Sequence, residues 1–226
     1  MPIKKYANKS SQSMKDLIKI NETKECIERG CTKFRKGLNR ECSAHSSARM
    51  YYGDAQAHKI RASYIRAERF KAEHIIDNNM DNELIQRGLT YMQNWLDQVR
   101  IGTPGVLASG AVGLMVDEEV TGKELFREAL AITIYNDRNP GIIPDRKPEA
   151  FQIALCIAVL CYRNLPKLGI RHRSHLHLSI SLRKTVGQVL WHDLGRILIE
   201  ITSAVSDYEK SHDPKTGAAK SLIIHS

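Results

Sequence analysis

The sequence has no long apolar run, and this absence excludes a membrane-spanning protein. Its longest apolar stretch, residues 154–162, is far shorter than the about 20 residues that cross a bilayer. The N-terminus is polar and basic and lacks the apolar segment of a secretory signal. We therefore expect no membrane association and a cytoplasmic location.

Several signatures of enzymes are also missing. There is no glycine-rich phosphate loop, no nucleophile elbow and no dinucleotide-binding fingerprint. Strand-like alternation is rare outside residues 170–180, and internal repeats are absent. The 226 residues are 42% hydrophobic and 26% charged, which is ordinary for a globular protein and enough to bury a core.

Three of the five cysteines lie together in a polar and basic segment. Cys26, Cys31, Cys42 and His45 follow the order Cys-x4-Cys-x10-Cys-x2-His, which is two ligand pairs around a spacer. Structural zinc takes four thiolate or imidazole ligands in a tetrahedron. Free cysteines are more often buried among apolar residues, and the residues around this segment are not apolar. The spacing therefore predicts a structural Zn²⁺ ion and a reducing compartment.

The metal-binding segment has further features besides its four ligands: Gly30, Gly37, Leu38, Arg49, Gly53 and Asp54. With them, residues 26–54 resemble the zinc-binding N-terminal segment of phage and prophage proteins of the HNH-endonuclease-associated type. The resemblance implies a phage-type zinc module, located in the cytoplasm of the bacterial host, that occurs with and without a nuclease domain. We expect positive φ angles at both glycines. We also expect Leu38 to fill the space under the zinc.

Positive charge is concentrated toward the N-terminus. The net charge is +9, and residues 1–80 hold 17 Lys+Arg against 9 Asp+Glu. Cations near phosphates release condensed counterions, so a basic segment around a small metal site is typical of a nucleic-acid binder. We predict binding to nucleic acid, with DNA as the expected ligand, and a merely solvated basic face as the alternative. The predicted phosphate contacts are Arg29, Lys33, Arg35, Lys36, Arg40, Arg49, Lys59, Arg61, Arg66, Arg69, Arg171 and Arg173.

Two other functions are compatible with the sequence. An HNH-type DNA endonuclease would need a histidine base beside a second, hydrolytic metal, and His74 is the nearest candidate. His74 lies where a helix is predicted to end, so a C-terminal cap formed by Asn78 and Asn79 is the simpler interpretation. The other alternative is an interaction protein, virion-associated or host-directed. Its zinc would be purely structural and its helical body would bind a protein partner.

The predicted fold is mainly α-helical, with a small N-terminal zinc module followed by a helical domain. Residues 1–54 would contain a flexible N-terminus, unstructured as far as residue 13, and the zinc module. Residues 55–226 would contain a long basic helix and the helical body. Asp81 or Asn82 and the Thr121–Glu124 capping box mark two helix starts. Helices are predicted over residues 55–77, 82–101, 105–116 (with a strand or loop as alternatives), 121–135, 149–164 and 181–210.

Overall fold

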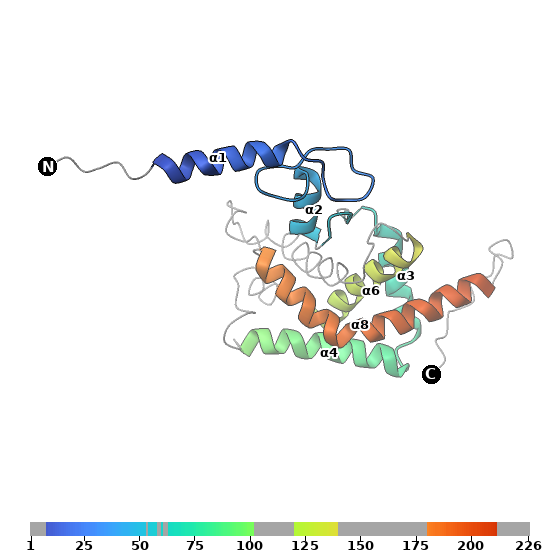
Figure 1. The fold of residues 1–226 in the computed structure, drawn as a ribbon. Helices are drawn as coiled ribbons and strands as arrows, with labels where there is room; N and C mark the ends of the chain where they lie inside the picture. Colours follow the sequence, from blue (N-terminus) through green and yellow to red (C-terminus); the bar gives the residue numbers. More distant parts are fainter. Residues whose placement is uncertain are drawn as a thin grey trace. The chain divides into compact units, whose positions relative to one another are not determined.

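The computed structural model describes residues 8–52, 54–57, 60, 63–101, 120–139 and 180–211 (Figure 1). These residues form helices and no sheet, with one isolated β-bridge between Glu25 and Phe34, so the predicted mainly α-helical class is confirmed. No helix in these ranges is both long and apolar enough to cross a membrane. The predictions at residues 105–116, 149–164 and 170–177 lie outside the described residues.

The chain divides into two compact units, residues 1–58 and residues 59–226. The first unit contains α1, the metal-binding segment and α2. The second unit contains the other four described helices. The helices are α1 (Asn8–Glu22), α2 (Ser43–Tyr52), α3 (Arg66–Asn78), α4 (Glu83–Ile101), α6 (Gly122–Arg138) and α8 (Ile180–Ser211).

Helix α6 is the centre of the second unit, because it packs against α3, α4 and α8, while α4 also packs against α8 (Figure 1). Nearly every apolar side chain of α6 is buried. Helices α4 and α6 approach each other closely at Gly88, where an added Cβ would lie 2.3 Å from the ring of Phe126. Any larger residue at this position would displace that buried ring.

The helix boundaries of the second unit follow the local signals in the sequence. The Asn82 side chain accepts a hydrogen bond from Leu84 N at 2.9 Å and so caps α4. The capping box of α6 is formed, with Glu124 N donating to Thr121 Oγ1 at 3.2 Å and Thr121 N donating to Glu124 Oε2 at 2.9 Å. The predicted apolar stripes of α4 and α8 lie in the core, which includes Ile85, Met92, Leu96, Val186, Leu190, Leu194, Ile197, Ile201 and Val205.

The predicted long helix from residue 55 is wrong in its extent. Helix α3 begins at Arg66, and turns precede it at residues 54–57 and 63–65. Its buried apolar residues are Ala72, Ile75 and Ile76. Before the helix, Ile60 and Ile65 are buried against Ile132 of α6. Tyr64 and Ala67, in contrast, are exposed. High helix propensity alone did not extend the helix to residue 55, and the apolar residues Ile60 and Ile65 before Arg66 pack on α6 without being helical.

The N-terminal prediction is also corrected in part. Residues 8–13, which we expected to be unstructured, form the first turns of α1. This segment contains Ser10, Ser11 and Ser13, and serine is compatible with a helix when the apolar residues that follow extend it. Met14, Leu17 and Ile18 lie at helical spacing on this helix.

Candidate metal centre

Backbone hydrogen bonds hold the loops of the metal-binding segment. Cys26 N donates to Lys33 O at 2.8 Å, and Arg35 N donates to Lys24 O at 3.0 Å. Between these strand-like stretches the chain turns at Gly30, which has φ of +77°, and a second turn contains Gly37 at +62°. Both positive angles are as predicted, and they allow tight turns that other residues rarely adopt.

Helix α2 supplies the other half of the cluster. Cys42 immediately precedes the helix, and its carbonyl accepts a hydrogen bond from Ser46 N at 3.0 Å. His45 lies in the first turn of α2. Residues three apart face the same side of a helical turn, so Cys42 and His45 point toward the loop that carries the first two cysteines.

The four side chains converge on one point. Their ligand atoms all lie within 4.8 Å of one another. Cys26 Sγ is 3.3 Å from His45 Nδ1, and Cys31 Sγ is 3.9 Å from Cys42 Sγ. A tetrahedral zinc ion would set two sulfurs about 3.8 Å apart and a sulfur and a nitrogen about 3.6 Å apart. The donor set and its spacing therefore fit a four-coordinate metal, and the cysteines are thiols rather than disulfides.

The surroundings favour the thiolate form at two of the three cysteines. Burial acts to raise the pKa of the Cys26 thiol, but hydrogen bonds with His45 and with the backbone N–H of Cys42 outweigh it and lower that pKa. Burial also acts to raise the pKa of Cys42, but hydrogen bonds with the backbone of His45 and with the other two cysteines of the cluster lower it. Thiolate is the form that binds a metal, so this part of the cluster is already biased toward ligation.

Arg49 on α2 joins both ligand-bearing loops. Its Nε donates to Glu41 Oε1 at 2.6 Å, and its Nη2 donates to Glu28 Oε1 at 2.9 Å. Glu28 lies between Cys26 and Cys31, and Glu41 immediately precedes the third ligand. The hydrogen bond with Glu41, against the effect of burial, raises the pKa of Arg49. Arg49, a predicted phosphate contact, therefore forms ion pairs with both loops of the candidate metal centre.

A second network, not foreseen from the sequence, attaches α1 to the same loops. Asn21 Nδ2 donates to the carbonyls of Gly37 at 3.0 Å and Asn39 at 2.7 Å. Gly37 N donates to Glu22 Oε1 at 2.9 Å, and Arg35 Nη1 donates to Asn21 Oδ1 at 3.3 Å. Arg35 therefore holds the end of α1 rather than projecting freely. An asparagine at the end of an amphipathic helix was the only signal, and it is shared by many ordinary helix ends.

Other predicted contacts in this segment remain on the surface. Arg29, Lys33 and Arg40 are exposed, and no described side chain pairs with them. Lys36 Nζ lies 3.6 Å from Glu22 Oε1 and is itself largely exposed. Leu38 is 55% exposed, so the expectation that it fills the space under the metal is wrong. The turn around Gly37 places Leu38 at the tip of the loop, away from the core of the module.

The predicted contacts of the second unit divide in three ways. Arg69 Nε donates to Oε2 of the buried Glu128 at 2.7 Å, so Arg69 is part of the interior and not a free cation. Arg66 is exposed on α3. The other predicted contacts, Lys59, Arg61, Arg171 and Arg173, lie outside the described residues.

The candidate catalytic histidine lies on a helix. His74 belongs to α3, with its Nε2 2.8 Å from Asn78 Nδ2. Asn79 ends the helix, donating from its backbone to Ile76 O at 3.3 Å and from its side chain to Ile75 O at 2.8 Å. The cap interpretation is confirmed, with Asn79 as the capping residue. Within the described residues, the Cys3His cluster is the only group placed to hold a metal.

No known protein family matches this chain. No curated protein and no solved structure matches it either. The likeness to phage zinc modules therefore rests on residues 26–54 alone and stays a prediction. The structure itself shows a helical protein with a Cys3His cluster that could hold a metal ion such as zinc.

Proposed function

We propose that the chain is a zinc protein whose N-terminal unit binds nucleic acid through its phosphates. The observation that carries the proposal is the convergence of Cys26, Cys31, Cys42 and His45 within 4.8 Å, in loops that also present unpaired cations. A bound zinc ion would cross-link these loops, and the loops would then present their charges without first losing conformational freedom.

Charge supports the choice of partner. Residues 1–58 hold 12 Lys+Arg against 6 Asp+Glu, while residues 59–226 hold 22 against 19. Most of the net positive charge, +6 of +9, therefore belongs to the unit that contains the metal cluster. Among the predicted contacts of this unit that the structure describes, Arg29, Lys33 and Arg40 are exposed and have no side-chain partner. Such contacts fix a protein on the phosphate backbone without choosing a sequence.

The structure narrows the residues that we propose to contact phosphate. Arg49 and Arg69 form ion pairs and Arg35 is hydrogen-bonded to Asn21, so we leave them out of the proposed set. The endonuclease alternative is not favoured. His74 lies on a helix and is hydrogen-bonded to Asn78, and within the described residues no second group that could hold a metal lies beside it. If the nucleic-acid proposal fails in the following experiment, an interaction protein with a structural zinc becomes the favoured alternative.

The test is the salt dependence of DNA binding by the zinc-loaded, full-length protein. The logarithm of affinity should fall with the logarithm of salt concentration, with a slope of about −0.9 per phosphate contact on duplex DNA and about −0.7 on single strands. Replacing Arg29, Lys33 and Arg40 by glutamine should remove up to about three phosphate contacts. The magnitude of the slope on duplex DNA should then fall by up to about 2.7 while zinc is retained.

A matched control removes the same charge elsewhere. Arg87, Lys123 and Arg196 lie on the second unit and have exposed side chains, and their triple replacement by glutamine should leave the slope unchanged. Equal affinity of wild type and the Arg29/Lys33/Arg40 variant at every salt concentration would contradict the proposal. The basic loops would then be a solvated face, and the interaction-protein alternative would replace it.

A further inference from the structure

Large apolar side chains are exposed on the same loops that hold the metal cluster. Ile27 is 44% exposed, Phe34 61% and Leu38 55%. These loops are fixed by backbone hydrogen bonds, including Ile27 N to Arg40 O at 3.2 Å. Side chains on a fixed backbone cannot collapse onto one another as they do in a flexible loop. Exposed apolar side chains on a fixed backbone are therefore candidates for contact with a ligand.

Phe34 is the most exposed of the three and has a defined position. It forms the antiparallel bridge with Glu25, and the flanking hydrogen bonds make these two residues a non-hydrogen-bonded pair. The ring therefore lies on one face of a short two-stranded ribbon. The backbone on either side of Phe34 is held by the hydrogen bonds of Lys33 O and Arg35 N. Lys33 precedes it and is exposed.

The charge around the ring favours a polyanion over an apolar protein surface. Residues 24–40 contain six basic side chains and two acidic ones, Glu25 and Glu28. Glu28 forms an ion pair with Arg49, which it shares with Glu41. Glu25 lies opposite the ring across the bridge, but the segment around it is net basic. An aromatic ring in a basic segment matches a ligand that carries both phosphates and flat ring faces. Nucleic acid is the macromolecule that combines the two.

We propose that Phe34 stacks on an unpaired nucleobase, so that the ligand of the N-terminal unit is a single strand. The inference rests on the proposed function and names its substrate class. In a duplex the faces of the bases are covered by their neighbours, so an aromatic side chain cannot stack on them, and only phosphates and base edges are accessible. A single strand exposes base faces, and stacking on an aromatic side chain tolerates any base.

The experiment compares a fluorescent 12-nucleotide single strand with its duplex, using full-length zinc-loaded protein. The wild type should prefer the single strand. Phe34→Ala should weaken single-strand binding about tenfold, the effect of losing one stacked base, and should leave the salt slope unchanged because no charge is removed. Phe34→Trp should bind as tightly as wild type, and the added tryptophan should be quenched by the strand.

Two controls separate stacking from damage to the fold. Phe70, which is 76% exposed on α3, is the matched aromatic residue, and Phe70→Ala should bind like wild type. Zinc content should be the same in all variants. The wild-type background for the quenching measurement comes from Trp95 and Trp191, which both lie in the second unit.

The results distinguish failure of the inference from failure of the proposed function. Equal affinity for strand and duplex, together with wild-type binding by Phe34→Ala, would overturn the stacking inference while the salt dependence still supports phosphate binding. Absence of salt-dependent binding to either nucleic acid would overturn both. An acidic protein surface would then replace nucleic acid as the proposed ligand of these loops.

Discussion

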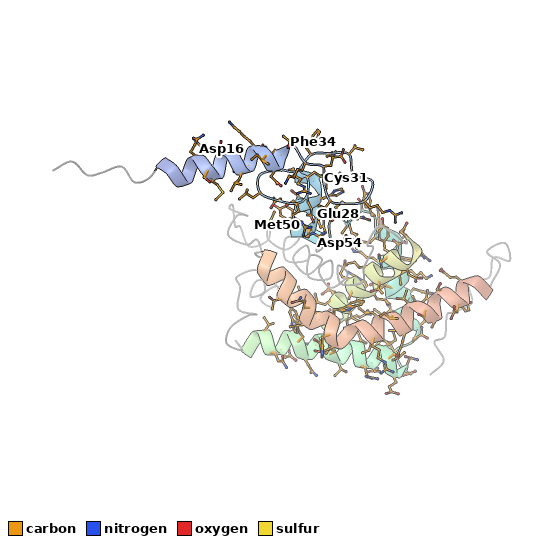
Figure 2. The ribbon with its side chains drawn as sticks, in the orientation of Figure 1. Asp16, Glu28, Cys31, Phe34, Met50 and Asp54 are labelled. Atoms are coloured by element: carbon orange, nitrogen blue, oxygen red, sulfur yellow. The ribbon has the colours of Figure 1, made fainter. Side chains whose placement is uncertain are left out.

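Arg49 Nη2 lies 2.9 Å from Glu28 Oε1, although the two residues are 21 positions apart in the chain. With the second ion pair to Glu41, this contact ties α2 to the loop of the first two ligands and to the loop of the third. The two loops of the candidate metal centre are therefore joined to α2 by ion pairs; Figure 2 labels Glu28 and Cys31. Groups that orient metal ligands from outside the coordination sphere commonly tune affinity.

Arg49→Gln should weaken zinc binding about tenfold, because both ligand-bearing loops lose their link to α2. Arg49→Lys should give an intermediate value, since one ammonium cannot reproduce two donors in a fixed fork. Affinity is measured by competition with a chromophoric chelator. Arg40→Gln, an exposed arginine of the same module without an ion pair, is the control and should bind zinc normally. Wild-type affinity in Arg49→Gln would show that the two ion pairs do not position the ligands.

Glu128→Gln should strongly destabilise the second unit. The Arg69–Glu128 pair is nearly inaccessible, with side-chain exposures of 12% and 2%, and breaking a buried pair costs about 3–5 kcal/mol. Urea unfolding followed by tryptophan fluorescence measures the loss. Glu200→Gln removes the exposed Arg196–Glu200 pair of α8 and should cost less than about 0.5 kcal/mol. A similar small loss in Glu128→Gln would mean that the interior pair adds little to stability.

Glu209→Gln should lower the melting temperature at neutral pH by about 2 °C, the result of losing roughly 0.5–1 kcal/mol. Glu209 of α8 accepts hydrogen bonds from Lys71 of α3 and, at 2.6 Å, from Arg138 of α6. Burial acts to raise the pKa of Glu209, but these two partners together lower it below its ordinary value of 4.5.

The sign of this shift sets the pH range of the effect. A carboxyl group with a lowered pKa in the folded protein stabilises it fully above pH 4.5, and the contribution is lost as the pH falls through the lower folded value. Melting curves of wild type and Glu209→Gln should therefore differ at pH 7 and converge in acid below pH 4.5. A difference that persists unchanged into that acid range would show that the carboxylate charge is not its source.

Much of the helical body could be predicted because its signals are local. The Thr121–Glu124 capping box and the apolar stripe of α8 are complete within a few turns of sequence, and each is found where it was expected. The ligand spacing and the turn glycines of the metal segment are equally local, and Gly30 and Gly37 have the predicted positive φ. Such patterns need no knowledge of the rest of the chain.

The ion pairs formed by the charged residues could not be predicted from local patterns. Arg69 meets a carboxylate that is 59 positions distant in the chain, and Arg49 meets one that is 21 positions distant. A count of Lys and Arg does not tell which guanidinium groups the fold will pair. The start of α3 was misplaced as well. Ile60 and Ile65 precede the helix and pack against Ile132 of α6 from turns and loop, so neither helix propensity nor apolar content marks Arg66 as the first helical residue.

The metal content of the purified full-length protein tests the central claim most directly. Wild type should contain about one zinc per chain, and Cys31→Ser or Cys42→Ser should lose it together with the fold of the first unit. The second unit should keep its helices in these variants, because its buried stripes pack on one another without a metal. Full zinc occupancy in a Cys26→Ser/Cys42→Ser double variant, or no zinc in the wild type under reducing conditions, would contradict the assignment of this cluster as a zinc site.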